Sequence, residues 1–225
     1  MKIEKFNFEK FKDIVISNIK DKKLLFHCSL VGGLTELKPS KSYAYKNGMQ
    51  PCVFASYHLN SILFYGSPKN NRDLDGMYGV FPNGETFFME AYENSLESIN
   101  KGEKCYIYIV DQKNSKFEEG QTSYPAEVVD GTGNAVKLLK CYQVDDIYEL
   151  MLKFYNYNLL HIWFYKDFDK NLHEKNLEYQ KSLIKRYDIF NLPDKHPIKE
   201  FCMQHFEGAV KDLKEQNPSS IGFGK

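Results

Sequence analysis

The sequence predicts an α+β fold, and two observations lead to this prediction. Strand-like apolar runs follow one another without the regular alternation of strand and helix that a parallel sheet needs, and helical patterns gather at the two ends of the chain. The 225 residues, 42% of them hydrophobic, suffice for one well-packed domain with an appendage. We therefore expect a domain over residues 1–150, a helical extension packed on it over 151–216 and a flexible tail over 217–225.

The composition gives no sign of a strongly charged partner. Thirty Lys and Arg balance thirty Asp and Glu, so no net field draws the chain to nucleic acid or to an anionic membrane. The five cysteines are odd in number and mostly lie in apolar runs, as reduced buried thiols do. The N-terminus has no signal-like run, and no later stretch approaches the roughly 20 apolar residues of a membrane span. We therefore expect a soluble, cytoplasmic protein with no membrane partner.

The first elements follow from apolar spacing and turn residues. A packing helix is predicted over residues 7–20, because apolar side chains recur there at steps of three and four. Strand Leu24–Cys28 follows, and then an ordered loop over residues 31–39, where two glycines and a proline prevent regular structure. Residues 40–50 are polar and contain the turn signal Asn47-Gly48, so we expect a loop that leads into strand Cys52–Ser56. Ser56 is the predicted N-cap of a helix over residues 57–65.

Strands dominate the middle of the chain. The clearest is Lys104–Val110, which is continuous in β-branched and aromatic residues. The other predicted elements, in order, are a hairpin of Met77–Phe81 and Thr86–Tyr92 around Asn83-Gly84, a short helix Ser95–Asn100, a charged loop Asp111–Gly120, a strand entered at Tyr124–Val129, a turn at residues 130–134 and a strand Ala135–Tyr142.

From about residue 145 the pattern is helical. Acidic residues Asp145 and Asp146 occupy the first turn of a predicted helix, where the helix dipole favours them. The apolar cluster at residues 159–164 belongs to this helical region, and two further helices are predicted within Leu172–Phe190 and Pro197–Gln216.

Three segments carry a candidate site. They are Phe26-His27-Cys28-Ser29, then Val53-Phe54-Ala55-Ser56 leading to Ser61-Ile62-Leu63-Phe64-Tyr65, and finally Ala126-Glu127-Val128-Val129. Histidine is the side chain that titrates near neutral pH, which makes His27 the first candidate for chemistry. In order and spacing over residues 23–150, these segments resemble the His, Tyr, Glu signature of the ADP-ribosyltransferase superfamily.

The resemblance implies a split, mixed or antiparallel sheet that binds NAD as a substrate without a metal. It also implies transfer of ADP-ribose to an unidentified protein or nucleic-acid acceptor, with release of nicotinamide. Glu127 would hold the 2′-hydroxyl of the ribose and stabilise an oxocarbenium-like transition state. His27 would bind the nicotinamide-side ribose, and Ser29 would contact the carboxamide.

The rest of the cofactor site is also carried over from the resemblance. Phe64 or Tyr65 would stack on the nicotinamide ring. Cys28 takes the place of the glycine usual in the family, and Ser56 ends the second strand. Val53 stands where a first stacking tyrosine is common, and Tyr43 or Tyr45 would replace it from the preceding loop.

Several alternatives remain open from the residues alone. Other carboxylates could serve in place of Glu127: Glu85, Glu90 and Glu119. His58 could line the same cleft or lie on a helix surface. The protein could also be a binding module that has lost the chemistry. A related RNA 2′-phosphotransferase is less favoured, because Arg72 and Arg186 are the only arginines and lysine lacks the fork that grips phosphate at two points.

Overall fold

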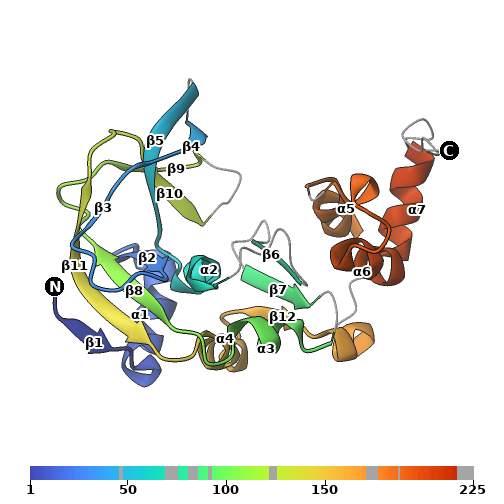
Figure 1. The fold of residues 1–225 in the computed structure, drawn as a ribbon, viewed down its shortest axis with the longest axis horizontal. Coiled ribbons are helices and arrows are strands. Elements are labelled where there is room, and N and C mark those ends of the chain that lie inside the picture. Colours follow the sequence, from blue (N-terminus) through green and yellow to red (C-terminus); the bar gives the residue numbers. More distant parts are fainter. Residues whose placement is uncertain are drawn as a thin grey trace. The chain divides into compact units, whose positions relative to one another are not determined.

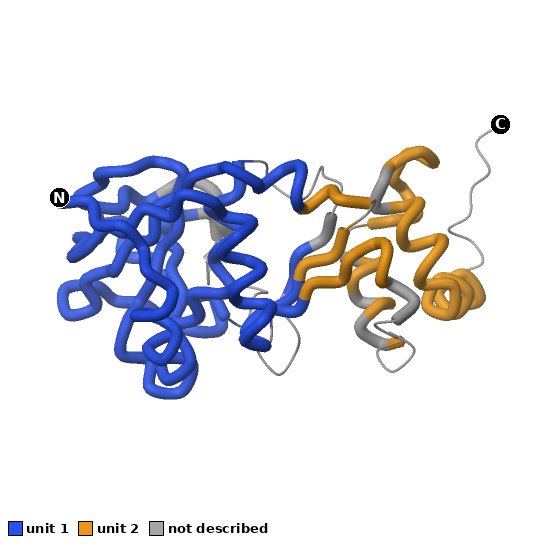
Figure 2. Tube along the Cα trace, turned by 90° about the horizontal axis from the view of Figure 1, so that it is seen from below, with its two compact units in different colours: residues 1–70, 78–87, 97–161 blue, residues 71–77, 88–96, 162–225 orange. Residues whose placement is uncertain are grey.

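The computed structural model describes residues 1–45, 48–68, 76–80, 86–90, 93–121, 126–170, 177–186 and 188–216. The chain forms two compact units, which Figure 2 colours blue and orange. Unit 1 comprises residues 1–70, 78–87 and 97–161, and unit 2 comprises residues 71–77, 88–96 and 162–225. The boundary expected after residue 150 thus falls inside a helix of unit 1, and the expected tail over 217–225 lies outside the described residues.

The structure confirms a mixed α+β protein, with a large sheet as its main feature (Figure 1). The strand order is β1-β11-β8-β2-β5-β10-β9, with β3 paired to β11 and β4 paired to β5. β1 runs parallel to β11, and the other recorded pairs are antiparallel. The strands are β1 (Ile3–Lys5), β2 (Leu25–Ser29), β3 (Glu36–Leu37), β4 (Ser40–Tyr45), β5 (Gly48–Ser56), β8 (Cys105–Val110), β9 (Phe117–Glu119), β10 (Glu127–Asp130) and β11 (Val136–Val144).

One face of this sheet is an apolar core, which we call the core face. Side chains alternate between the two faces of a strand, and on the central strands every second residue belongs to this core. Its buried members are Leu25, Leu37, Val53, Ala55, Tyr108, Val110, Val128, Val136, Leu138 and Cys141. Phe26, Cys28, Ile107 and Ile109 are buried on the opposite face, so the central strands are covered on both sides, which accounts for the continuous apolar runs of the sequence.

The sheet opens between β2 and β5. β2 pairs with β8 along its whole length, from Leu25 to Ser29. With β5, within the described residues, it has a single registered pair, Phe26 with Ser56. The two strands separate after that pair, so the carboxyl end of β2 has a sheet partner on one side only.

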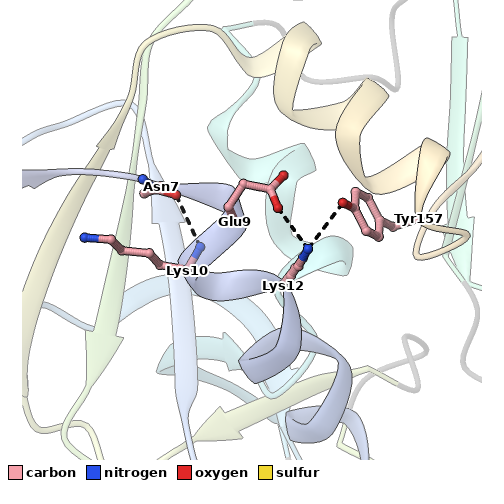
Figure 3. Close-up of polar contacts among 5 residues, drawn as sticks. All are labelled: Asn7, Glu9, Lys10, Lys12 and Tyr157. Carbon is pink, nitrogen blue, oxygen red and sulfur yellow. Dashed lines mark hydrogen bonds and ion pairs between the residues drawn. The ribbon is translucent and has the colours of Figure 1, made fainter.

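Helix α1 (Phe8–Asp21) confirms the helix predicted over residues 7–20. Asn7 caps its first turn by accepting a hydrogen bond from the Lys10 amide at 3.2 Å (Figure 3). On the same helix, the Lys12 ammonium donates to Glu9 at 2.9 Å and to the Tyr157 hydroxyl at 3.4 Å (Figure 3). Lys12 therefore joins α1 to the residue that follows α4 (Ile147–Asn156).

Two short helices lie next to the opening of the sheet. α2 (Leu59–Ile62) and the 3-10 turn η1 (Leu63–Gly66) replace the single helix expected over residues 57–65. The predicted N-cap, Ser56, is wrong, because His58 is the N-cap residue of α2. Gly66 ends η1 and lies directly on the sheet, since a Cβ atom there would be 2.6 Å from the Cys28 sulfur.

Two segments expected to be loops contain strands. Residues 40–50 hold β4 and the start of β5. Of the Asn47-Gly48 turn signal, Gly48 is the first residue of β5 and Asn47 lies outside the described residues. Within Asp111–Gly120, β9 pairs with β10 at the edge of the sheet. Charged residues are tolerated in β9, because β10 satisfies its backbone and an edge strand keeps side chains in water.

A second, three-stranded sheet has the order β12-β7-β6. β6 (Gly76–Val80) and β7 (Thr86–Glu90) confirm the two predicted hairpin strands, while residues 81–85 lie outside the described residues. β12 (His161–Trp163) corrects the helical prediction for residues 159–164. A short apolar run suits either structure, and here pairing with β7 decides.

The remaining elements are mainly helical. α3 (Ser95–Asn100) and α4 were predicted, and the Asp146 carboxylate caps α4 through the Glu149 amide at 3.0 Å. Unit 2 contains α5 (Leu177–Arg186), and the helix predicted over 197–216 is divided into α6 (Pro197–His205) and α7 (Glu207–Gln216). None of the described helices is long and apolar enough to cross a membrane.

Candidate functional site

Unit 1 contains an open hollow of about 220 Å³ beside the end of β5. Its walls come from segments that are far apart in the sequence but meet at this end of the sheet: β5, α2, η1, β6 and the start of β10. The described lining residues are Ser56, Ser61, Ile62, Tyr65, Tyr78, Ala126 and Glu127. We call this hollow the Glu127 pocket.

Glu127 is the acidic residue of the pocket. It is the first residue of β10, is paired with Ser56 of β5, and is only 6% exposed. The Tyr65 hydroxyl donates a hydrogen bond to its Oε1 atom. A carboxylate that is this buried needs such a donor, because burying an unpaired charge is costly.

Tyr65 and Phe64 have different surroundings. Tyr65 is 42% exposed and lines the pocket, whereas the Phe64 ring stacks on Tyr78 with 4.8 Å between centroids and 2° between planes. Phe64 is not among the described residues that line the pocket. Of the two aromatic candidates, therefore, Tyr65 is the one that the structure brings to Glu127.

Ser56 links three backbone segments around the pocket. Its hydroxyl donates to the Ala126 carbonyl at 2.5 Å and accepts from the His58 amide at 2.9 Å. The end of β5, the entry to β10 and the start of α2 are thereby held together. The Ser56 hydroxyl thus helps to shape the pocket.

Four of the described lining residues were missed as site residues: Ser61, Ile62, Tyr78 and Ala126. Tyr78 of β6 donates from its hydroxyl to the Ser61 carbonyl, and the Ser61 and Thr86 hydroxyls are 2.8 Å apart. Tyr78 lies in a strand of the predicted hairpin, and no local pattern in the sequence distinguishes it from a core tyrosine.

The described lining of the pocket has one formally charged side chain, Glu127. The remaining polar atoms belong to hydroxyl groups and backbone. A pocket of this kind favours a group that donates hydrogen bonds or carries positive charge over a phosphate.

The structure does not bring His27 to this pocket. Phe26 pairs with Ser56, and Ser56 pairs with Glu127, so these three side chains share one face of the sheet. His27 follows Phe26 along β2 and therefore points to the other face, the core face. It is not among the described lining residues.

His27 instead bridges the opening of the sheet. Its Nδ1 atom lies 3.0 Å from the Phe54 carbonyl oxygen, so Nδ1 carries the proton and donates it. Burial lowers the pKa of His27 from its ordinary value, although the hydrogen bond to Phe54 opposes this shift. The neutral imidazole of His27 thus joins β2 to β5 by a side-chain hydrogen bond, beyond the single registered pair of the two strands.

Cys28 and Ser29 are also absent from the described pocket lining. The Ser29 hydroxyl accepts from the Val31 amide at 3.1 Å and so closes a local turn. Cys28 is buried, and a hydrogen bond with Cys105 and desolvation raise the pKa of its thiol. Tyr43 and Tyr45 lie in β4, and their side chains are outside the described part of the chain.

The alternative carboxylates have other roles, where the structure describes them. Glu90 is buried in β7 and accepts from the Tyr165 amide at 3.1 Å and the Leu96 amide at 3.3 Å, while desolvation raises its pKa. Glu119 forms an ion pair with Lys22 at 2.5 Å. Glu85 lies outside the described residues. Among the candidates that the structure describes, Glu127 is the one in the pocket.

His58 lies close to the pocket without lining it, as far as the described residues show. Burial and the nearby Lys22 lower the pKa of His58. The described residues contain no group of three or more His, Cys, Asp or Glu side chains placed to hold a metal ion.

Comparison of the chain with protein-family models, with curated proteins and with solved structures finds no match.

Proposed function

We propose that unit 1 is an ADP-ribosyltransferase-like enzyme that binds NAD at the Glu127 pocket and transfers ADP-ribose to a macromolecular acceptor with release of nicotinamide. The observation that carries the proposal is the Glu127 carboxylate, which lines an open pocket and is held there by Tyr65. The order of the sheet also supports it. The strands that hold His27, Ser56 and Glu127 are neighbours in the sheet, as β2-β5-β10, so the three segments of the resemblance lie together.

Glu127 would act on the ribose of NAD. When the bond from the ribose to nicotinamide breaks, nicotinamide leaves with the electron pair and positive charge develops on the sugar. A nearby carboxylate stabilises that charge. Because a carboxylate has about four lone-pair sites, Glu127 can accept from Tyr65 and from a ribose hydroxyl at once. The acceptor then bonds to the sugar and releases its proton to water.

The charge of the lining limits what the pocket would hold. Its volume of about 220 Å³ includes space that is open to solvent, so it is not the volume of an enclosed cavity. We infer that the pocket receives the nicotinamide end of NAD, while the phosphates remain outside. This assignment agrees with a lining whose described charge is negative, since the nicotinamide end carries the positive charge.

The test is to incubate the whole chain with NAD labelled in its adenylate part, together with cell lysate, and to measure labelled product and released nicotinamide. Glu127→Gln preserves shape and removes the charge, and it should lower the rate about 100-fold to 1,000-fold. Glu36→Gln is the control, because Glu36 is an exposed strand residue of unit 1 outside the described pocket lining. No turnover and no NAD binding in any lysate would refute the proposal.

A second candidate is a binding module that holds NAD or a related ligand without cleaving it. The observation that favours it is the position of His27, which faces away from Glu127 and is engaged with Phe54. Calorimetry that finds NAD binding without hydrolysis, unchanged by Glu127→Gln, would establish this candidate over the first.

A further inference from the structure

The strongest further feature is a pair of buried thiols beneath η1. Cys28 of β2 and Cys105 of β8 lie on adjacent strands and are 2% and 0% exposed. Cys28 is paired with Ile107, two residues from Cys105, so alternation puts both thiols on the same face of the sheet. Both thiols are free.

Gly66 shows how close the two sulfur atoms are. A Cβ atom at Gly66 would lie 2.6 Å from the Cys28 sulfur and 3.0 Å from the Cys105 sulfur. Both sulfurs are therefore within 3.0 Å of one point, directly under the last residue of η1. The neighbouring Cys105 thiol and burial raise the pKa of Cys28, which agrees with this proximity.

We propose that Cys28 and Cys105 are a redox modification site, at which a peroxide forms a reversible disulfide whose formation is controlled by opening of η1. The proposal does not depend on the proposed function. One thiol is first oxidised to a sulfenic acid, and the peroxide is reduced to water. The second thiol then attacks that sulfur, forms the disulfide bond and releases a second water, so two thiols lose two protons and two electrons.

In this structure the disulfide can form only if the two sulfur atoms move closer together and η1 opens. The sulfurs must approach to about 2.05 Å. Cys28 and Cys105 are diagonal neighbours on β2 and β8, so the backbone at Cys105, the first residue of β8, would have to shift for the bond to form. A disulfide that requires such movement is strained and is therefore easily reduced again. While η1 is closed, both thiols are buried, and buried thiols react slowly with an oxidant in water.

Opening of η1 also concerns the Glu127 pocket, because Tyr65 precedes Gly66 in the same turn. When η1 lifts from the thiols, the hydrogen bond from Tyr65 to Glu127 has to break. Anything that holds Tyr65 on Glu127 therefore protects the thiols from oxidation, and disulfide formation displaces Tyr65 in return.

The experiment treats the whole chain with hydrogen peroxide in native buffer, alkylates the remaining thiols and maps the peptides by mass spectrometry. We expect a linkage between Cys28 and Cys105, loss of two of the five thiols, and recovery with dithiothreitol. Cys28→Ser and Cys105→Ser should each abolish the linkage, whereas Cys202→Ser in unit 2 should keep it. Oxidation at other cysteines only, or a linkage that forms only in denaturant, would overturn the proposal.

The control by η1 has its own test. Tyr65→Phe removes the hydrogen bond to Glu127 and should speed formation of the disulfide about tenfold. Tyr157→Phe is the matched control, because both tyrosines are 42% exposed and both hydroxyls are hydrogen bonded. Equal rates in the Tyr65→Phe variant and the wild type would show that η1 does not gate the thiols.

Discussion

Replacement of Asn18 by alanine should cost unit 1 much of its stability. Asn18 lies on α1, is 2% exposed, and makes three hydrogen bonds of 2.7 Å with the backbone. Its amide nitrogen donates to the Leu24 and Tyr57 carbonyls, and its carbonyl oxygen accepts from the Leu24 amide. One side chain thus joins α1 to the entry of β2 and to the residue after β5.

The magnitude follows from these three bonds. A hydrogen bond contributes about 0.5–1.5 kcal/mol net, and a buried backbone group left without a partner costs at least as much. Alanine returns roughly 0.5 kcal/mol through its better helix propensity. We therefore expect Asn18→Ala to lower the free energy of unfolding by about 3 kcal/mol, which corresponds to roughly 6–12 °C in the melting temperature of a domain this size.

The assay is thermal unfolding followed by circular dichroism and calorimetry, with Asn156→Ala as the control because Asn156 is an exposed residue at the end of α4. Asn18→Asp is a second variant of nearly the same shape. It places an oxygen against two carbonyls and should destabilise at least as much as alanine. If Asn18→Ala melts within 2 °C of the control, where about 6–12 °C is expected, water replaces the three bonds and the reasoning is refuted.

Three further outcomes can be measured in the same way. Gly66→Ala should destabilise by about 1–3 kcal/mol, because its Cβ would lie 2.6 Å from the Cys28 sulfur; an unchanged melting temperature would contradict this packing. Gly208→Ala in α7 should stabilise by up to about 1 kcal/mol, since the nearest atom, on Leu177, is 3.5 Å away. The pKa of His27 is lower in the folded chain than in the unfolded chain. Below about pH 6.5 the unfolded chain therefore binds a proton at this histidine that the folded chain does not bind, and the free energy of unfolding falls as the pH falls. Denaturant titrations at pH 7 and pH 5.5 should show a smaller loss in His27→Gln than in the wild type, by at most about 1.4 kcal/mol per pH unit; His58, whose pKa is also lowered, still contributes in both.

Elements with a strong local signal were predicted correctly. α1 and β8 have the expected positions within one or two residues, because periodic apolar spacing and a run of β-branched and aromatic residues describe a buried face directly. The same signal could not separate strand from helix at β12, nor find β4 and β9, whose existence depends on partner strands far away in the sequence.

The candidate site shows the same division. Glu127 and Tyr65 were identified as candidates from the order of the segments, but their hydrogen bond was not, because it joins a strand to a turn 62 residues away. The position of His27 was also beyond local reasoning. Whether a side chain faces Glu127 depends on the register between strands, and a shift of one residue reverses the face.

The sequence by itself therefore determined the class of fold, the position of the periodic elements and the presence of a carboxylate at residue 127. Only the tertiary structure decided which side chains share a face with that carboxylate. The physical reason is that apolar periodicity records burial along one segment, whereas a site depends on pairing between segments. Here Phe26 pairs with Ser56, and Ser56 pairs with Glu127. This pairing turns His27 to the core face and leaves Glu127 on the opposite face, where Tyr65 of η1 donates a hydrogen bond to it.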